Sequence, residues 1–176
     1  MILDKLKHQA AIKSLKKALD ANEKNASGYI KTTKIQTIGF VVNFDEFNHT
    51  EVFKELAEQI GLRPNSFKII GYSEKGITGS GYTIPVFSDK DLGWGGNFKN
   101  GDIDEFLSRD YDLLVNYYQK STPILKLVSV RAKAGVKVGL LDDNQAINQI
   151  TFKIAPSSFT KFRDELIKYL KILKKI

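Results

Sequence analysis

Short runs of β-branched and aromatic residues alternate with amphipathic segments along most of this 176-residue sequence. Residues 35–43 have the near-continuous apolar pattern of a strand that is covered on both faces. Residues 49–61 follow with apolar side chains at helical spacing, and residues 66–72 again have the pattern of a strand. A strand, a helix and a second strand in this order predict a βαβ unit with parallel strands.

The same order recurs in the second half of the chain. Residues 111–118 predict a buried strand, and Ser121 with Pro123 opens a helix over residues 123–134. Residues 135–141 have the pattern of the next strand. This half of the chain therefore contains a second βαβ unit.

The C-terminal part adds an edge strand and a long helix. After a turn at residues 142–144, apolar and polar side chains alternate over residues 147–154, as in a half-exposed strand. Ser157 and Ser158 are expected to cap a last helix, whose inward residues are Phe159, Phe162, Leu166, Leu170 and Leu173. The complete pattern predicts an α/β fold, a Rossmann-like three-layer sandwich with a mostly parallel sheet and helices on both faces.

The first 34 residues have a different character. The apolar residues of the N-terminal helix fall on two nearly opposite sides, with Leu3, Leu6 and Ala10 on one and Ile12, Leu15 and Leu19 on the other. Residues 21–34 have the polar and glycine content of a linker. We therefore expect an appended basic helical arm with its linker at residues 1–34, and a single Rossmann-like domain at residues 35–176.

The composition excludes several classes of protein. The chain contains no cysteine, which excludes disulfides, thiolate nucleophiles and cysteine zinc sites and fits a reducing compartment. Charges interrupt the N-terminal residues too often for a signal peptide, and no apolar run approaches the roughly 18 residues of a membrane span. We expect a cytoplasmic protein without a transmembrane segment.

The net charge of +7 is concentrated at the two ends of the chain. Residues 1–34 contain eight lysines against three acidic residues, and residues 161–176 contain six basic against two acidic residues. Such charge attracts phosphate-rich partners, either RNA or an anionic membrane surface, although lysines also simply keep amphipathic helices in solution. The candidate anion-binding residues are Lys5, Lys7, Lys13, Lys16, Lys17, Lys168, Lys171, Lys174 and Lys175.

A glycine-rich segment between Gly71 and Gly101 contains the only tryptophan. Within it, the run GITGSG at residues 76–81 has the composition of a phosphate loop, but no helix pattern follows it, so an ordinary loop is favoured. Glycines on both sides of Trp94 let the backbone fold tightly. We expect the ring of Trp94 to fill a core, with a stacking platform for a base or sugar as the alternative.

Few residues are candidates for catalysis or metal binding. His8 and His49 lie in separate predicted elements, too far apart in role for a metal pair or a catalytic triad. The sequence contains no nucleophile elbow, P-loop or metalloprotease motif. We therefore expect neither a metal nor a cofactor.

A crevice at the carboxyl ends of the strands is the expected place for any small ligand. The residues that border it in the predicted sheet are Asn43, Asp45, Glu46, Asn116 and Tyr117. The alternative is structural, because Asp45 and Asn48 have the residue types of a turn and a cap for the helix near His49.

Several of these segments resemble the N-terminal half of the heptosyltransferase-like (GT-B) glycosyltransferases. The runs YDLLVNYY and STPILKLVSVRAKAGVKVGLLD are similar to a strand, helix and strand of that family, and DEFNHTEVFKELAEQIG looks like its first helix. The family's catalytic base is an acidic residue after the first strand, and Glu46 is at the matching position. Asp45 stands where the family has glycine, and the second domain that binds the nucleotide-sugar is missing, so we assign no catalytic residue.

The chain also resembles, over most of its length, a small bacterial family of unknown function, through VFSDKDLGWGG followed by DEFLSRDYDLLVNYY. We predict a non-catalytic binding module whose basic terminal helices contact RNA or the ribosome. The alternatives are a sugar- or nucleotide-binding protein derived from a glycosyltransferase half, and a protein held peripherally at an anionic membrane. A protein partner is a further candidate.

Overall fold

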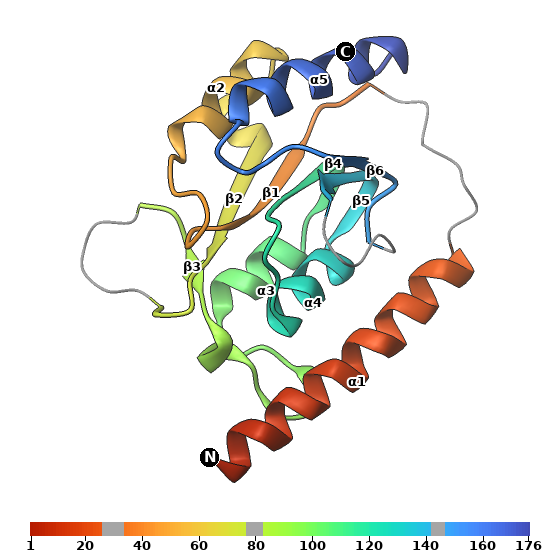
Figure 1. Ribbon diagram of the computed structural model, residues 1–176. Coiled ribbons are helices and arrows are strands. Elements are labelled where there is room, and N and C mark those ends of the chain that lie inside the picture. Colours follow the sequence, from red (N-terminus) through yellow and green to blue (C-terminus); the bar gives the residue numbers. More distant parts are fainter. Residues whose placement is uncertain (26–33, 77–82, 142–146) are drawn as a thin grey trace.

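The computed structural model describes residues 1–25, 34–76, 83–141 and 147–176 (Figure 1). In this part of the chain six parallel strands form one sheet, in the order β3-β2-β1-β4-β5-β6. The strands are β1 (Ile38–Asn43), β2 (Phe67–Tyr72), β3 (Val86–Phe87), β4 (Asp110–Tyr117), β5 (Lys133–Leu140) and β6 (Ile150–Phe152). The chain runs from the middle of the sheet to one edge and then to the other, which is the order of a Rossmann-like sheet. The prediction of an α/β sandwich with a parallel sheet is confirmed.

Helices cover both faces of the sheet (Figure 1). On one face lie α2 (Glu51–Gln59) and α5 (Phe159–Ile172). On the other lie α3 (Gly101–Leu107) and α4 (Pro123–Arg131), with α1 (Ile2–Asn25) packed outside α4. Three 3₁₀ turns complete the described elements: η1 (Pro64–Ser66), η2 (Asp89–Asp91) and η3 (Trp94–Gly96).

The central position of β1 explains its continuous apolar sequence. All of its residues are buried, with Phe40 and Val42 in the core beneath α2 and α5 and Val41 in the core beneath α3 and α4. On the first of these faces, aromatic rings pack around Tyr117, with ring centroids 5.2 Å away for Phe47 and 5.3 Å away for Phe53. Two apolar layers, one on each face, therefore hold the sheet.

Several predicted element boundaries are wrong. Thr122, not Ser121, is the N-cap of α4, because its hydroxyl oxygen accepts a hydrogen bond from the Leu125 amide. Residues 21–25, expected in the linker, belong to α1, and α3 was not expected at all. The rest of the linker at 26–33, most of the GITGSG run, and the turn at 142–144 lie outside the described residues.

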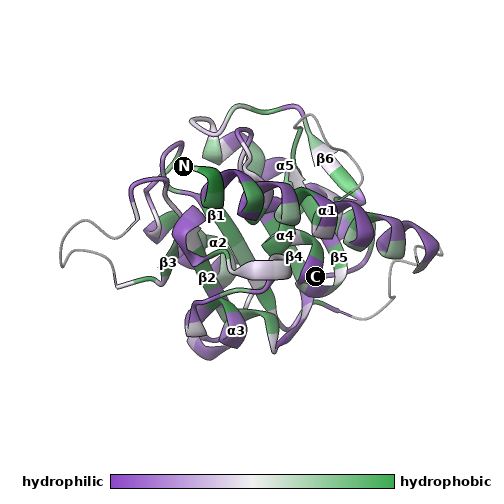
Figure 2. Ribbon diagram, turned by 90° about the horizontal axis from the view of Figure 1, so that it is seen from below, coloured by the Kyte–Doolittle hydropathy of each residue, from purple (hydrophilic) through white to green (hydrophobic). Residues whose placement is uncertain are grey.

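Helix α1 packs through one narrow stripe. Ala11 and Leu15 are buried against the α3 and α4 face, and the Ser14 hydroxyl donates a hydrogen bond to the Gly95 carbonyl of η3, at 3.0 Å. Figure 2 shows α1 lying across this face, with hydrophobic residues at its N-terminal turn. There Met1, Ile2, Leu3 and Leu6 are exposed. Of the two apolar sides found in the sequence, one is exposed at Leu3 and Leu6, and the other is buried at Leu15 but exposed at Ile12.

Candidate functional site

The predicted crevice residues come from neighbouring strands. Asn43 ends β1, Asn116 and Tyr117 end β4, and β1 and β4 are adjacent, with Val42 opposite Tyr117. The order of the sheet reverses between these two strands, which is where ligands of doubly wound folds bind. The fold therefore brings the predicted residues to one edge of the sheet.

The hydrogen-bonding groups of this edge are largely occupied by the chain itself. One carboxylate oxygen of Glu46 accepts hydrogen bonds from the backbone amides of Gln119 and Lys120, at 2.8 and 2.9 Å. The Asn43 amide nitrogen donates to the Lys120 carbonyl at 2.8 Å, and its oxygen accepts from the Asp45 amide at 3.0 Å. Glu46 thus fills the backbone donors that an anionic ligand would use, and it ties the loop after β1 to the loop after β4.

Asp45 links β1 to β2 and does not cap α2. Its two carboxylate oxygens accept from the Ser73 hydroxyl and the Glu74 amide, both at 2.8 Å. Thr50 is the residue at the N-cap of α2. The expectation that Asp45 is a turn residue agrees with these bonds, whereas the expectation of Asn48 as the cap is wrong.

Asn116 and Tyr117 point into packed surroundings. The Asn116 amide nitrogen donates to Asn148 at 2.7 Å, and the Tyr117 hydroxyl donates to the Pro156 carbonyl at 2.6 Å. Burial, and then the charge of Glu46, raise the pKa of Tyr117. A neutral phenol that is bonded to a carbonyl and surrounded by aromatic rings acts as a packing residue.

The lysines of α1 form an exposed cationic surface. Lys5, Lys13, Lys16 and Lys17 are exposed, and Lys7 is half-buried. Within the part of the chain that the structure describes, none of these five ammonium groups lies within 4.0 Å of a carboxylate. This surface therefore keeps its positive charge.

The α5 lysines do not extend the α1 surface, because α1 and α5 lie on opposite faces of the sheet (Figure 1). Lys168, Lys171 and Lys174 are exposed, and the Lys168 ammonium lies 3.6 Å from the Glu165 carboxylate. Lys175 is only 4% exposed, and its backbone carbonyl accepts a hydrogen bond from the Ile35 amide. The prediction that Lys175 is a surface cation is therefore wrong, because the chain turns inward after α5.

Trp94 does not fill a core. Its side chain is 54% exposed, so the prediction of a core residue is wrong. The adjacent glycines bring the backbone of η3, and not the ring, against α1: Gly95 and Gly96 have positive φ, and a Cβ at Gly96 would overlap the Ser14 side chain. The Arg131 guanidinium donates to the Gly96 carbonyl at 2.6 Å and lies over the Phe98 ring. The loop thus presents an exposed indole beside a basic helix.

The sheet order and the two-sided helical layers define a Rossmann-like α/β domain that carries a docked basic helix. The chain belongs to DUF6913, a family of unknown function, whose family model matches residues 7–173. The matched range begins within α1 and ends one residue after α5. No curated protein and no solved structure matches the chain.

Among the described residues, no group of three or more histidine, cysteine or acidic side chains is arranged to hold a metal ion. No helix in the described ranges combines the length and apolar character needed to span a membrane.

Proposed function

We propose that this protein is a non-catalytic RNA-binding module and that single-stranded RNA lies along α1 and η3. The observation that carries the proposal is a group of exposed α1 lysines, which have no ion pairs with the described residues, next to the exposed Trp94. Single-stranded nucleic acids are held by cationic surfaces that follow the phosphates and by aromatic rings on which bases stack. Both groups occur on this side of the domain.

Lys13, Lys16 and Lys17 supply the electrostatic part of the proposed site. They fall within about one and a half turns of α1, on the side away from the buried Ala11 and Leu15. Each lysine that neutralises a phosphate releases condensed counterions, which makes binding depend steeply on salt.

Trp94 supplies the stacking part. The hydrogen bond from Ser14 to Gly95 fixes η3 against α1, and Ser14 is next to Lys13 and one turn from Lys17. A base stacked on an aromatic ring contributes about 1–3 kcal/mol.

Fluorescence anisotropy with a labelled single-stranded RNA at several salt concentrations tests this proposal. We compare the wild type with a triple variant, Lys13→Gln, Lys16→Gln and Lys17→Gln. The matched control is Lys161→Gln, Lys168→Gln and Lys171→Gln on α5, which removes the same charge from the opposite face.

The α1 variant should reduce the slope of log K against log salt by about 2, because each phosphate contact on a single strand contributes about 0.7. The control should keep the wild-type slope. Equal losses in both variants would show that only the net charge matters, and absence of binding at low salt would refute the proposal. The same comparison tests the prediction that α5 lysines also bind anions.

A second candidate function, attachment to an anionic membrane surface, is favoured by the exposed apolar residues at the start of α1. Leu3 and Leu6 are exposed beside Lys5, the pattern of a helix that lies in the membrane interface. Flotation with vesicles containing phosphatidylserine tests it. Leu3→Ser with Leu6→Ser should abolish flotation. A wild type that does not float would rule the attachment out, and unchanged flotation of the variant would show that Leu3 and Leu6 do not carry it.

The sugar- or nucleotide-binding alternative remains a prediction for the edge between β1 and β4. It requires Glu46 to release the two amides that it now accepts from. A thermal-shift screen with millimolar nucleotides and nucleotide-sugars tests it, and Glu46→Ala should increase any anion binding there.

A further inference from the structure

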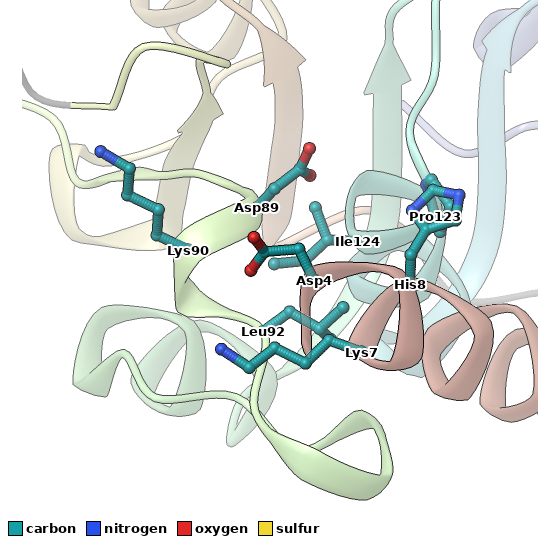
Figure 3. A pocket seen from close by; sticks show the side chains of 8 residues that line it. All are labelled: Asp4, Lys7, His8, Asp89, Lys90, Leu92, Pro123 and Ile124. Atoms are coloured by element: carbon teal, nitrogen blue, oxygen red, sulfur yellow. The ribbon is translucent and has the colours of Figure 1, made fainter. Parts of the chain in front are cut away.

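The inward stripe of α1 changes from apolar to charged along the helix. Ala11 and Leu15 occupy this stripe where α1 packs on the domain. One and two turns earlier, the same stripe carries His8 and Asp4 at helical spacing. These residues and Lys7 line a pocket of about 430 Å³ (Figure 3). The helix thus covers a polar cavity with its N-terminal half.

The other walls of the pocket come from the carboxyl ends of the strands. Asp89, Lys90 and Leu92 follow β3, while Pro123 and Ile124 form the first turn of α4, which follows β4. In open parallel sheets, ligands bind outside this edge. The volume falls in the range of small-molecule sites, and the apolar Leu92 and Ile124 provide contact area beside the charges.

Next to the pocket is a buried hydroxyl without a hydrogen-bond partner. Tyr72, the last residue of β2, is 2% exposed, and its hydroxyl makes no hydrogen bond within the described residues. Burial raises the pKa of Tyr72 to about 12, with Thr122 opposing and Asp89 adding to the shift, so the phenol stays protonated. A buried polar group without a partner is costly, and Asp89, which lines the pocket, is one of the side chains that shift the pKa of this hydroxyl.

Opposite charges are arranged around the cavity. In Figure 3 the Asp4 carboxylate points from α1 toward η2, and the Asp89 carboxylate points from η2 toward the ends of the central strands. Lys7 and Lys90 start at the wall of the pocket and their ammonium ends point outward, while His8 lies on the other side, next to Pro123. Burial raises the pKa of Asp89, with Tyr72 and the charge of His8 acting in the opposite direction. Carboxylates and ammonium groups are therefore available to one small ligand.

We propose that this pocket binds a small zwitterionic molecule that carries both a primary ammonium group and a carboxylate, as a free amino acid does. The ammonium group is held by Asp89, with Asp4 at the rim, and the carboxylate by Lys7 and Lys90. A simple anion is disfavoured by the two aspartates, and a simple amine by the three basic side chains. The Tyr72 hydroxyl supplies one further hydrogen bond, either to the ligand or to the Asp89 carboxylate as it turns to the ligand.

Isothermal titration and thermal shift with the full chain test this proposal. The probes are the twenty free amino acids, putrescine and ethylamine as amines, acetate and succinate as acids, and inorganic phosphate. We expect at least one amino acid to bind, and amines, acids and phosphate to bind at least tenfold more weakly. The site is wrong if no amino acid binds at millimolar concentration, and the ligand class is wrong if an amine, an acid or phosphate binds equally well.

Two variants with matched controls place the ligand in this pocket. Asp89→Asn should weaken binding at least tenfold, whereas Asp110→Asn, at an exposed carboxylate on the opposite edge, should not change it. Tyr72→Phe should weaken binding without lowering the apo Tm, because the hydroxyl has no hydrogen-bond partner among the described residues. Tyr117→Phe should show the reverse, a lower apo Tm and unchanged affinity, since its hydroxyl is bonded to Pro156. Wild-type affinity in both Asp89→Asn and Tyr72→Phe would overturn the proposal.

Discussion

The stability of this protein should rise with pH between about 8 and 10, because of one buried lysine. Lys137 on β5 is 5% exposed, and its ammonium group donates to the carbonyls of Ser129 and Val130, both at 2.9 Å. These carbonyls belong to the last turn of α4, where helical carbonyls lack partners and a cation is favoured. Burial nevertheless lowers the pKa of Lys137 from 10.5 to about 8.

The sign and size of the effect follow from this difference. Below pH 8 the lysine is charged in both states, and the native state carries the cost of burying the charge. Between pH 8 and 10.5 the unfolded chain binds more protons than the native protein, so the free energy of unfolding rises with pH. The difference between 10.5 and about 8 corresponds to roughly 3 kcal/mol. Above pH 10 the buried Tyr72, Tyr111 and Tyr117, whose pKa values are raised by burial, act in the opposite direction.

Urea unfolding of the wild type and of Lys137→Met at several pH values from 7 to 10 measures this effect. In the variant the free energy of unfolding should not rise over this pH range, because methionine has a similar shape and does not titrate. Lys133→Met is the control, since Lys133 lies on the same strand but its side chain is 70% exposed. A rise that persists in Lys137→Met, or a wild type whose stability is constant over this range, would refute the reasoning.

Three further predictions concern the fold and the proposed RNA surface. Gly71→Ala should lower the free energy of unfolding by about 1–3 kcal/mol in urea titration, because the new Cβ would overlap the Phe44 ring. The control Gly101→Ala should leave the free energy of unfolding unchanged, because a Cβ at Gly101 has open space. Glu46→Ala should cost about 1–3 kcal/mol in the same assay, since two backbone amides lose their acceptor, and an unchanged midpoint would contradict this. Trp94→Ala should change stability by less than about 0.5 kcal/mol while weakening RNA binding about tenfold, and retained affinity in anisotropy would remove Trp94 from the site.

The central strands could be predicted because a strand that is buried on both faces needs apolar residues at almost every position. In β1 every residue is buried, so the pattern is a continuous apolar run and not an alternation. Helix α3 has no recognisable helical pattern in its sequence, because it has seven residues and buries only Ile103 and Phe106, too few to establish a helical period. Strand β3, two residues long after Pro85, is equally weak as a signal.

The position of the strand-end residues was predictable, but their bonding was not. Parallel strands place Asn43 and Asn116 at one edge whatever the details of the loops. The amide donors that the Glu46 carboxylate accepts from are 73 and 74 residues away along the chain, so no local pattern indicates that this carboxylate is already hydrogen-bonded. The prediction that Trp94 fills a core was wrong for a related reason. The glycines around it indicate that the backbone packs closely against another element, but the sequence does not show whether the ring or the backbone makes that contact.

Helix α1 carries the two proposed sites on different sides, and this makes them separable. The sequence placed Leu15 on one of two opposite apolar sides without indicating which side faces the domain, and it left Asp4 and His8 unassigned. In the structure Leu15 is buried, and Asp4 and His8 line the pocket from the same side of the helix. Asp4→Asn should therefore weaken the binding of an amino acid and leave the affinity for RNA unchanged or slightly higher. The triple glutamine variant at Lys13, Lys16 and Lys17 should do the opposite, because these side chains are exposed and do not line the pocket. If each variant weakened both ligands, α1 would act as one electrostatic unit, and the assignment of two separate sites would be wrong.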